Sequence, residues 1–165
     1  MATLMTVAIG NFSIGAVMKN TLCINSIKPV EISHSDLASI VRVMDDEPRY
    51  SDFFSALASH PASEVRCAVA FKTCLPIETL VKLSRDKSIE VVRDVTLNET
   101  ALNSFDESQL QEMIDRDVSV AVYLADNLFM VGEEKLDGLI NLLLQHPDPR
   151  VAETADEFYS SRQVE

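Results

Sequence analysis

Histidines and clustered carboxylates are the residues of this chain whose types could support chemistry. The sequence holds three histidines, His34, His60 and His146, and the last two directly precede a proline. Histidine serves as a base, a proton shuttle or a metal ligand near neutral pH. However, His60 and His146 recur at equivalent places in a repeated pattern, whereas catalysis needs one such residue at one site. We therefore interpret both as structural residues that cap the C-terminal end of a helix.

Three groups of carboxylates have the residue types for acid–base chemistry or for binding a divalent cation. They are Asp45-Asp46-Glu47, Asp115 with Asp117, and Glu133-Glu134. All three groups flank predicted helix boundaries, and their spacing matches neither an EF-hand nor another ligand pattern. We interpret them as solvated residues at helix ends.

Cysteines and glycines give no sign of a redox, metal or nucleotide site. Cys23, Cys67 and Cys74 are an odd number without tight spacing, which is typical of a reducing compartment. Cys67 and Cys74 are therefore predicted to be small buried residues. With only four glycines, the chain has no phosphate loop, dinucleotide fingerprint or G-x-S-x-G motif. We predict no catalytic residue, no cofactor and no metal.

The chain is strongly acidic, and its charge is uneven. The formal net charge is −12, from 14 basic and 26 acidic side chains. Residues 100–165, the acidic third, carry 4 basic and 14 acidic side chains, a net charge of −10. Such a surface repels polyanions and attracts basic proteins. We therefore expect no binding to nucleic acid or to a membrane.

The length of 165 residues fits one domain with an appendage. No apolar run reaches the roughly 18 residues that a membrane span needs. The apolar N-terminus lacks a basic leading region, so a signal peptide is not expected. The cytoplasm is the expected location.

Residues 1–30 differ in pattern from the rest of the chain. Three apolar runs of seven residues, 3–9, 12–18 and 21–27, are separated by Gly-Asn and Lys-Asn, which suit short hairpin turns. We predict an N-terminal antiparallel β-meander; the alternative is a frayed apolar helix. Exposed edges of such a sheet pair readily with a second chain, so a homodimer through this segment is expected.

From residue 31 onward the apolar period is helical, and one unit recurs about four times. Four short helices are predicted at residues 64–72, 90–98, 119–127 and 150–158. Their second residues, Val65, Val91, Val120 and Val151, are spaced 26, 29 and 31 apart. Between them lie predicted helices in 75–86, 105–117 and 131–148, each with an acidic first turn. Such short helices are marginal alone and need the cover of the next pair, which predicts a stack of helix pairs over residues 31–165.

The stretch "HPASEVRCAVAFKTCLPIETLVKLSRD" resembles the leucine-rich repeat variant, a bacterial HEAT-like α-repeat. The matching residues of this first copy are His60, Pro61, Glu64, Val65, Arg66, Ala68, Val69, Ala70, Leu75, Pro76, Glu78, Leu80, Leu83 and Asp86. The second copy keeps Glu90, Val91 and Val95, and the fourth keeps His146, Pro147 and Val151. The resemblance covers about residues 50–160 and implies an α–α superhelix with a curved surface for a partner.

One described type of this family carries an iron–sulfur cluster on an N-terminal cysteine-rich segment. Only Cys23 lies there in this chain, so the cluster is not implied. HEAT-like folds also include DNA glycosylases with a basic groove. No tryptophan and no basic stripe are present here, so that activity is not expected.

We therefore predict a mainly α protein that acts as a non-enzymatic adaptor or inhibitor and binds a basic protein through a curved, acidic surface. The candidate partner-binding residues are Arg66, Lys72, Arg93, Asp94, Asp126 and Asn127. The same side chains would alternatively form hydrogen-bonded ladders between repeats. Two other functions stay open: an enzyme or cofactor-binding protein on the same scaffold, and an acidic mimic of nucleic acid.

Overall fold

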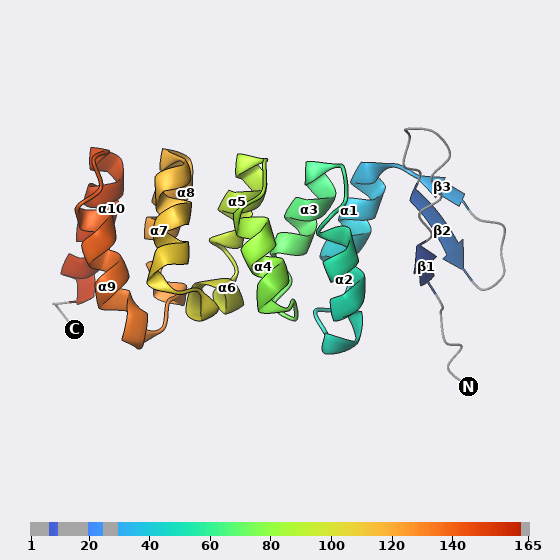
Figure 1. The fold of residues 1–165 in the computed structure, drawn as a ribbon, viewed down its shortest axis with the longest axis horizontal. Coiled ribbons are helices and arrows are strands. Elements are labelled where there is room, and N and C mark those ends of the chain that lie inside the picture. Colours follow the sequence, from blue (N-terminus) through green and yellow to red (C-terminus); the bar gives the residue numbers. More distant parts are fainter. Residues whose placement is uncertain (1–6, 10–19, 25–29, 163–165) are drawn as a thin grey trace.

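The structure is a computed structural model, and it describes residues 7–9, 20–24 and 30–162. Helices dominate this part of the chain, as the sequence predicts, and they lie side by side along the long axis (Figure 1). A small sheet lies at one end of the row, and the last two helices lie at the other.

The sheet has three antiparallel strands in the order β1-β2-β3. They are β1 (Val7–Ile9), β2 (Asn20–Ile24) and β3 (Val30–Ile32). Val7 pairs with Ile24, and Leu22 pairs with both Ile9 and Val30. The described residues near the N-terminus therefore form strands and not the alternative, an apolar helix. The predicted strand at residues 12–18 lies outside the described residues, and β3 crosses the predicted domain boundary between residues 30 and 31.

The helical part begins with a strong capping signal. In α1 (His34–Val43) the Ser33 hydroxyl accepts a hydrogen bond from the N–H of Asp36, whose carboxylate accepts from the N–H of Ser33. Such a capping box satisfies two of the free donors at a helix start. A short 3-10 turn, η1 (Pro48–Tyr50), leads into α2 (Ser51–Leu57), which ends before Pro61.

Five helices contact one another in succession and form the first row: α1, α3, α5, α8 and α10. Four of them carry the repeated valines: α3 (Ser63–Ala70), α5 (Ile89–Val95), α8 (Val118–Asp126) and α10 (Pro149–Arg162). All four lie within one residue of the predicted starts. The residues at the second and sixth places of each repeated unit are fully buried: Val65/Val69, Val91/Val95, Val120/Leu124 and Val151/Ala155.

The remaining helices form the second row, which packs against the first. It comprises α2, α4 (Ile77–Ser84), α6 (Glu99–Ser104), α7 (Glu107–Arg116) and α9 (Glu133–Leu144), with a 3-10 turn η2 (Leu128–Met130) before α9. The helices α4, α7 and α9 each contact the next helix of the first row. Buried residues from Leu37 in α1 to Ala155 in α10 make one continuous core. A continuous core fixes the helices relative to one another, so surface residues of different helices hold defined positions.

Candidate protein-binding surface

Arg66 lies inside the molecule, where it joins α3 to the loop between α4 and α5. Its side chain is 5% exposed, and its Nε and Nη2 atoms donate to the two carboxylate oxygens of Asp86 at 2.7 and 2.8 Å. Its Nη1 donates to the carbonyl oxygens of His60 and Pro61 at 2.7 and 3.0 Å. Burial alone would raise the pKa of Asp86, but hydrogen bonds from Arg66 and from the N–H of Ser88 outweigh it, and the pKa is lowered. Arg66 therefore makes hydrogen bonds inside the helical part, as in the alternative to partner binding.

Lys72 and Asn98 lie at equivalent places, each seven residues after a repeated valine. The buried Lys72 Nζ donates to the carbonyl oxygens of Met44 and Arg42, just past and within the last turn of α1. The fully buried Asn98 Nδ2 donates to the carbonyl oxygens of Ala70 and Lys72 at 2.7 and 3.0 Å, at the end of α3. Each side chain thus satisfies carbonyl groups that the preceding helix of the first row leaves free. Lys72 thus makes a contact between repeats, the alternative stated for it, and Asn98, which is not among the six candidates, makes the equivalent contact one repeat later.

Arg93 and Asp94 lie on α5 and reach the neighbouring helices on either side. The Arg93 guanidinium lies 4.7 Å from the centre of the Tyr123 ring on α8, a cation–π contact. The buried Arg93 Nε has no hydrogen-bond partner among the described residues. Burial raises the pKa of Asp94, against the lowering effect of a hydrogen bond with the Cys67 thiol on α3. Both candidates are half-buried and are tied mainly to their neighbours.

Asp126 and Asn127 lie at the end of α8. The Asp126 side chain is exposed, and no hydrogen bond or ion pair links it to another described residue. Asn127 is the counterpart of Lys72 and Asn98, but its Nδ2 donates to the Tyr123 carbonyl of its own helix at 2.7 Å. The six candidates therefore do not form one surface, and of them Asp126 is the exposed one.

The thiols of Cys67 and Cys74 are in environments that suppress ionisation. Cys67 is buried, as predicted, while Cys74 is partly exposed. Burial, with the neighbouring Asp94, raises the pKa of Cys67 to about 12, and burial beside Asp46 raises that of Cys74 to about 11. Because the thiolate is the reactive form, we expect both to react with a disulfide reagent at mildly alkaline pH roughly 100-fold more slowly than a free cysteine. The rate is measurable in a Cys23→Ser variant; rapid reaction of either thiol in the folded protein would contradict this assignment.

The two repeated histidines share one local structure, which differs from the predicted cap. Their Nδ1 atoms accept hydrogen bonds from the N–H groups of Ala62 and Asp148, two residues further on, at 3.2 and 3.1 Å. An accepting Nδ1 carries no proton, so this nitrogen does not donate to helix carbonyls. Burial is the main reason that the pKa of His60 is lowered. Both histidines thus make a structural contact, but each accepts a hydrogen bond from the turn that follows it and does not act as a charged helix cap.

The three carboxylate groups lie at helix ends, as predicted. Asp117 caps α8 by accepting from the N–H and hydroxyl of Ser119. Asp46 accepts from the N–H groups of Thr73 and Cys74 and so fixes the loop after α1 to the loop after α3. Glu133, in the first turn of α9, pairs with Arg162. Among the described residues, no group of three or more His, Cys, Asp and Glu is arranged to hold a metal ion.

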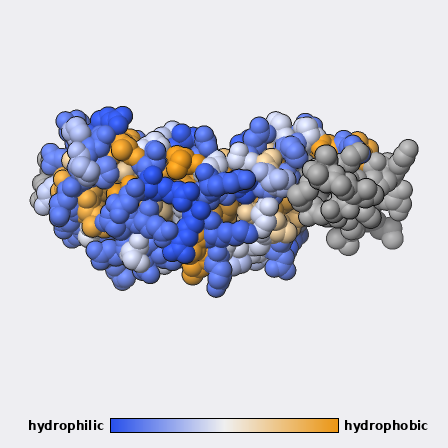
Figure 2. Space-filling model, turned by 45° about the horizontal axis from the view of Figure 1, so that its top comes forward, coloured by the Kyte–Doolittle hydropathy of each residue, from blue (hydrophilic) through white to orange (hydrophobic). Residues whose placement is uncertain are grey.

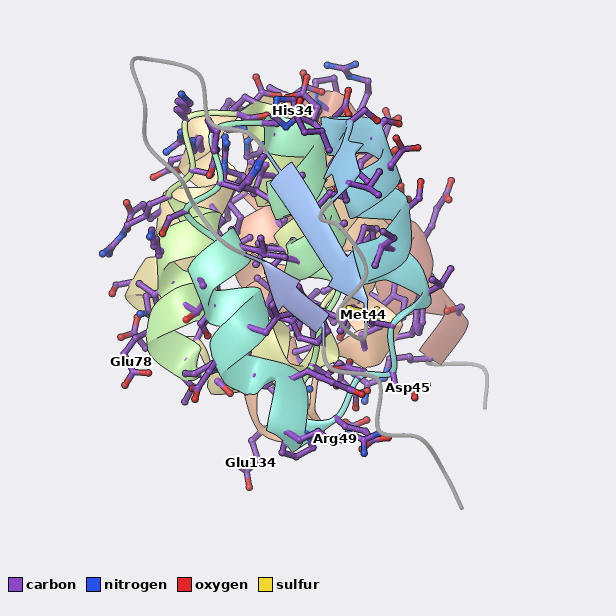
Figure 3. All side chains as sticks on the ribbon, turned by 90° about the vertical axis from the view of Figure 1, so that its right-hand side faces the viewer. His34, Met44, Asp45, Arg49, Glu78 and Glu134 are labelled. Atoms are coloured by element: carbon purple, nitrogen blue, oxygen red, sulfur yellow. The ribbon has the colours of Figure 1, made fainter. Side chains whose placement is uncertain are left out.

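A groove between α7 and α9 is the surface feature that sequence reasoning missed. Its cavity measures about 180 Å³ and is lined by Glu107, Leu110, Glu134, Lys135, Gly138, Leu139 and Leu142. The Glu134 side chain projects away from the ribbon (Figure 3). The signal in the sequence was Gly138 within the leucine-rich segment 136–144, where a larger residue would be usual in a packed helix.

The rest of the visible surface is mostly polar. Figure 2 shows a largely hydrophilic face across the helical part, interrupted by smaller apolar patches. Seven large apolar side chains are more than a third exposed among the described residues: Val30, Val43, Phe71, Ile77, Tyr123, Phe129 and Tyr159. No helix in the described part of the chain is both long enough and apolar enough to cross a bilayer.

Comparison of the chain with protein families, with curated proteins and with solved structures finds no match in any of the three.

Proposed function

We propose that this chain is a non-enzymatic protein-interaction module, an adaptor or inhibitor, that acts in the cytoplasm. Its two rows of helices form an α–α superhelix of the HEAT-like kind, and its acidic third binds a basic partner protein. The observation that carries the proposal is a set of exposed carboxylates in residues 100–165 that have no ion pair or hydrogen bond with another described residue.

These carboxylates are spread over three helices. Glu107 on α7, Asp126 on α8 and Glu134 on α9 are exposed, and none has a hydrogen bond or ion pair with another described residue. Two acidic groups earlier in the chain are instead used internally: Asp86 binds Arg66, and Asp46 binds backbone N–H groups. Unpaired surface charge of one sign steers a partner of the opposite sign and raises its association rate.

The packing supports a rigid binding surface. The buried valines and the ladder from Lys72 and Asn98 hold each helix of the first row against the next. A surface that is ordered before binding loses less conformational entropy when the partner docks. A preformed surface of this kind therefore suits recognition of a folded or extended partner.

The test compares two variants of equal total charge. The protein is used to capture its partner from the native cell, and the association rate of the identified partner is then measured at low and high salt. We expect the triple variant Asp126→Asn, Glu153→Gln, Glu157→Gln, at exposed positions of α8 and α10, to associate roughly tenfold more slowly at low salt, with little difference at high salt. The matched control, Asp52→Asn, Glu64→Gln, Glu78→Gln, removes the same charge from exposed positions outside the acidic third.

The location of the charge decides the outcome. If the control variant slows association as much as the first variant, total charge matters and the acidic third does not bind the partner. If neither variant changes the rate and salt has no effect, the electrostatic proposal is wrong.

A further inference from the structure

We infer that the groove between α7 and α9 receives one apolar side chain from a basic, extended segment of the partner protein. The inference rests on the proposed function and names the contact by which the acidic third would recognise its partner.

The size of the groove fits a side chain better than a metabolite. Pockets for small molecules usually measure about 300–1,000 Å³, whereas this cavity measures about 180 Å³. Two leucines of its lining, Leu110 and Leu139, are 3% and 2% exposed, so the core holds these walls in place. Leu142 is half-buried and offers additional apolar surface. Preformed apolar pockets of this kind receive the anchor residues that dominate binding between proteins.

Gly138 keeps the groove open. Apart from its two chain neighbours and the backbone of its own helix, no heavy atom lies within 4 Å of the position that a Cβ atom would occupy at this residue, and the glycine lies within the helix α9. Alanine would favour the helix over glycine at such a position. A glycine with free space beside it, in a helix otherwise rich in leucine, leaves room for an atom group from outside the chain.

The charges at the rim select a basic segment. Glu107 and Glu134 lie in the first turns of α7 and α9 and line the groove without a partner among the described residues. Lys135 also lines the groove, but its ammonium group donates to the carbonyl oxygens of Asn103 and Phe105 at the end of α6. Its aliphatic stem therefore adds apolar surface, while its charge is bound elsewhere. A leucine-sized side chain flanked by lysine or arginine matches both the walls and the rim.

The probe for the test is a fluorescent peptide with one central leucine between lysines, compared with the same peptide carrying alanine in place of leucine. We expect the leucine peptide to bind roughly tenfold more tightly, because a buried leucine side chain contributes more apolar area than alanine. Binding should shift the amide resonances of Leu110 and Leu139. Equal affinity of the two peptides would overturn the inference.

Two substitutions on α9 distinguish an effect on the groove from an effect on the stability of the fold. We expect Gly138→Leu to abolish the preference for the leucine peptide while leaving the melting temperature unchanged or raised. Asn141→Leu, the matched control, adds the same side chain at an exposed position of α9 outside the groove and should keep the preference. If Gly138→Leu proves unstable, Gly138→Ala serves instead, with a reduced preference expected. A preference that survives both substitutions at Gly138 places the anchor elsewhere.

The rim is tested by Glu107→Gln combined with Glu134→Gln. This double variant should bind both lysine peptides several-fold more weakly and still prefer leucine over alanine. An unchanged affinity would contradict the role of the rim. If the peptides fail these tests but the partner still depends on charge in the acidic third, the groove assignment fails alone. If charge in the acidic third has no effect on the partner, the proposed function itself fails.

Discussion

Replacing Arg66 by alanine should lower the free energy of unfolding by about 3–5 kcal/mol, the usual result of removing one partner from a buried ion pair. The substitution leaves the Asp86 carboxylate, 10% exposed in its side chain, without two hydrogen bonds. It also leaves the carbonyl oxygens of His60 and Pro61 without their donor. Urea unfolding followed by circular dichroism measures the change.

A double-mutant cycle identifies the cause. Arg66→Ala combined with Asp86→Ala should be less destabilised than the sum of the two single variants, because the double variant leaves no unpaired buried charge. Arg85→Ala is the matched control: Arg85 also pairs with a carboxylate, Glu112, but both side chains are about half exposed, so a loss below about 1 kcal/mol is expected. Similar losses for Arg66 and Arg85 would show that burial does not determine the strength of these pairs.

The Arg66–Asp86 pair should also make the stability of the protein depend on pH. The pKa of Asp86 is lowered in the folded protein, so the unfolded chain binds the proton more tightly. The contribution of the pair is fully present above the pKa of an unfolded aspartate, about 3.9, and is lost as the pH falls through the lower folded value. The wild type should therefore lose more stability on acidification than Arg66→Ala does.

Much of the helical architecture followed from the sequence because one pattern was repeated. The valines at 65, 91, 120 and 151 indicated four helices of the first row, and all four are buried as expected. Periodicity of apolar residues reports which side of a helix faces the core. The strands near the N-terminus were placed less accurately, because short apolar runs define neither their ends nor their pairing register.

The polar residues were harder to assign for a physical reason. Arg66 and Lys72 are long side chains at positions beside the buried seam, and the sequence alone does not show whether such a chain turns outward or inward. The acceptors that turn them inward, Asp86 and the carbonyl of Met44, lie 20 and 28 residues away. The groove was missed for the same reason, since it forms only where Leu110 of α7 and Gly138 of α9 lie side by side.

Asn98 is the residue whose loss should most directly weaken the contact between successive helices of the first row. Its Oδ1 accepts from the N–H of Ala101 at the start of α6, while its Nδ2 donates to two carbonyl oxygens at the end of α3. Asn98→Ala leaves these buried groups unpaired and removes a helix cap, so we expect a loss of about 3 kcal/mol. Asn127→Ala is the control at the equivalent position, where the hydrogen bond is local and exposed, and should cost below about 1 kcal/mol.

Asn98→Asp distinguishes a lost hydrogen bond from a misplaced charge. The carboxylate keeps the cap on Ala101 but faces the carbonyl oxygens of Ala70 and Lys72, with no donor for either. At neutral pH this variant should be less stable than Asn98→Ala, because a buried carboxylate against two acceptors is disfavoured. Its pKa should be raised in the folded state, so its stability relative to Asn98→Ala should increase as the pH falls and the protonated group donates to one carbonyl. A stability difference that does not change with pH would mean that water reaches Asn98, and the ladder between the helices would then be an exposed contact of little energetic weight.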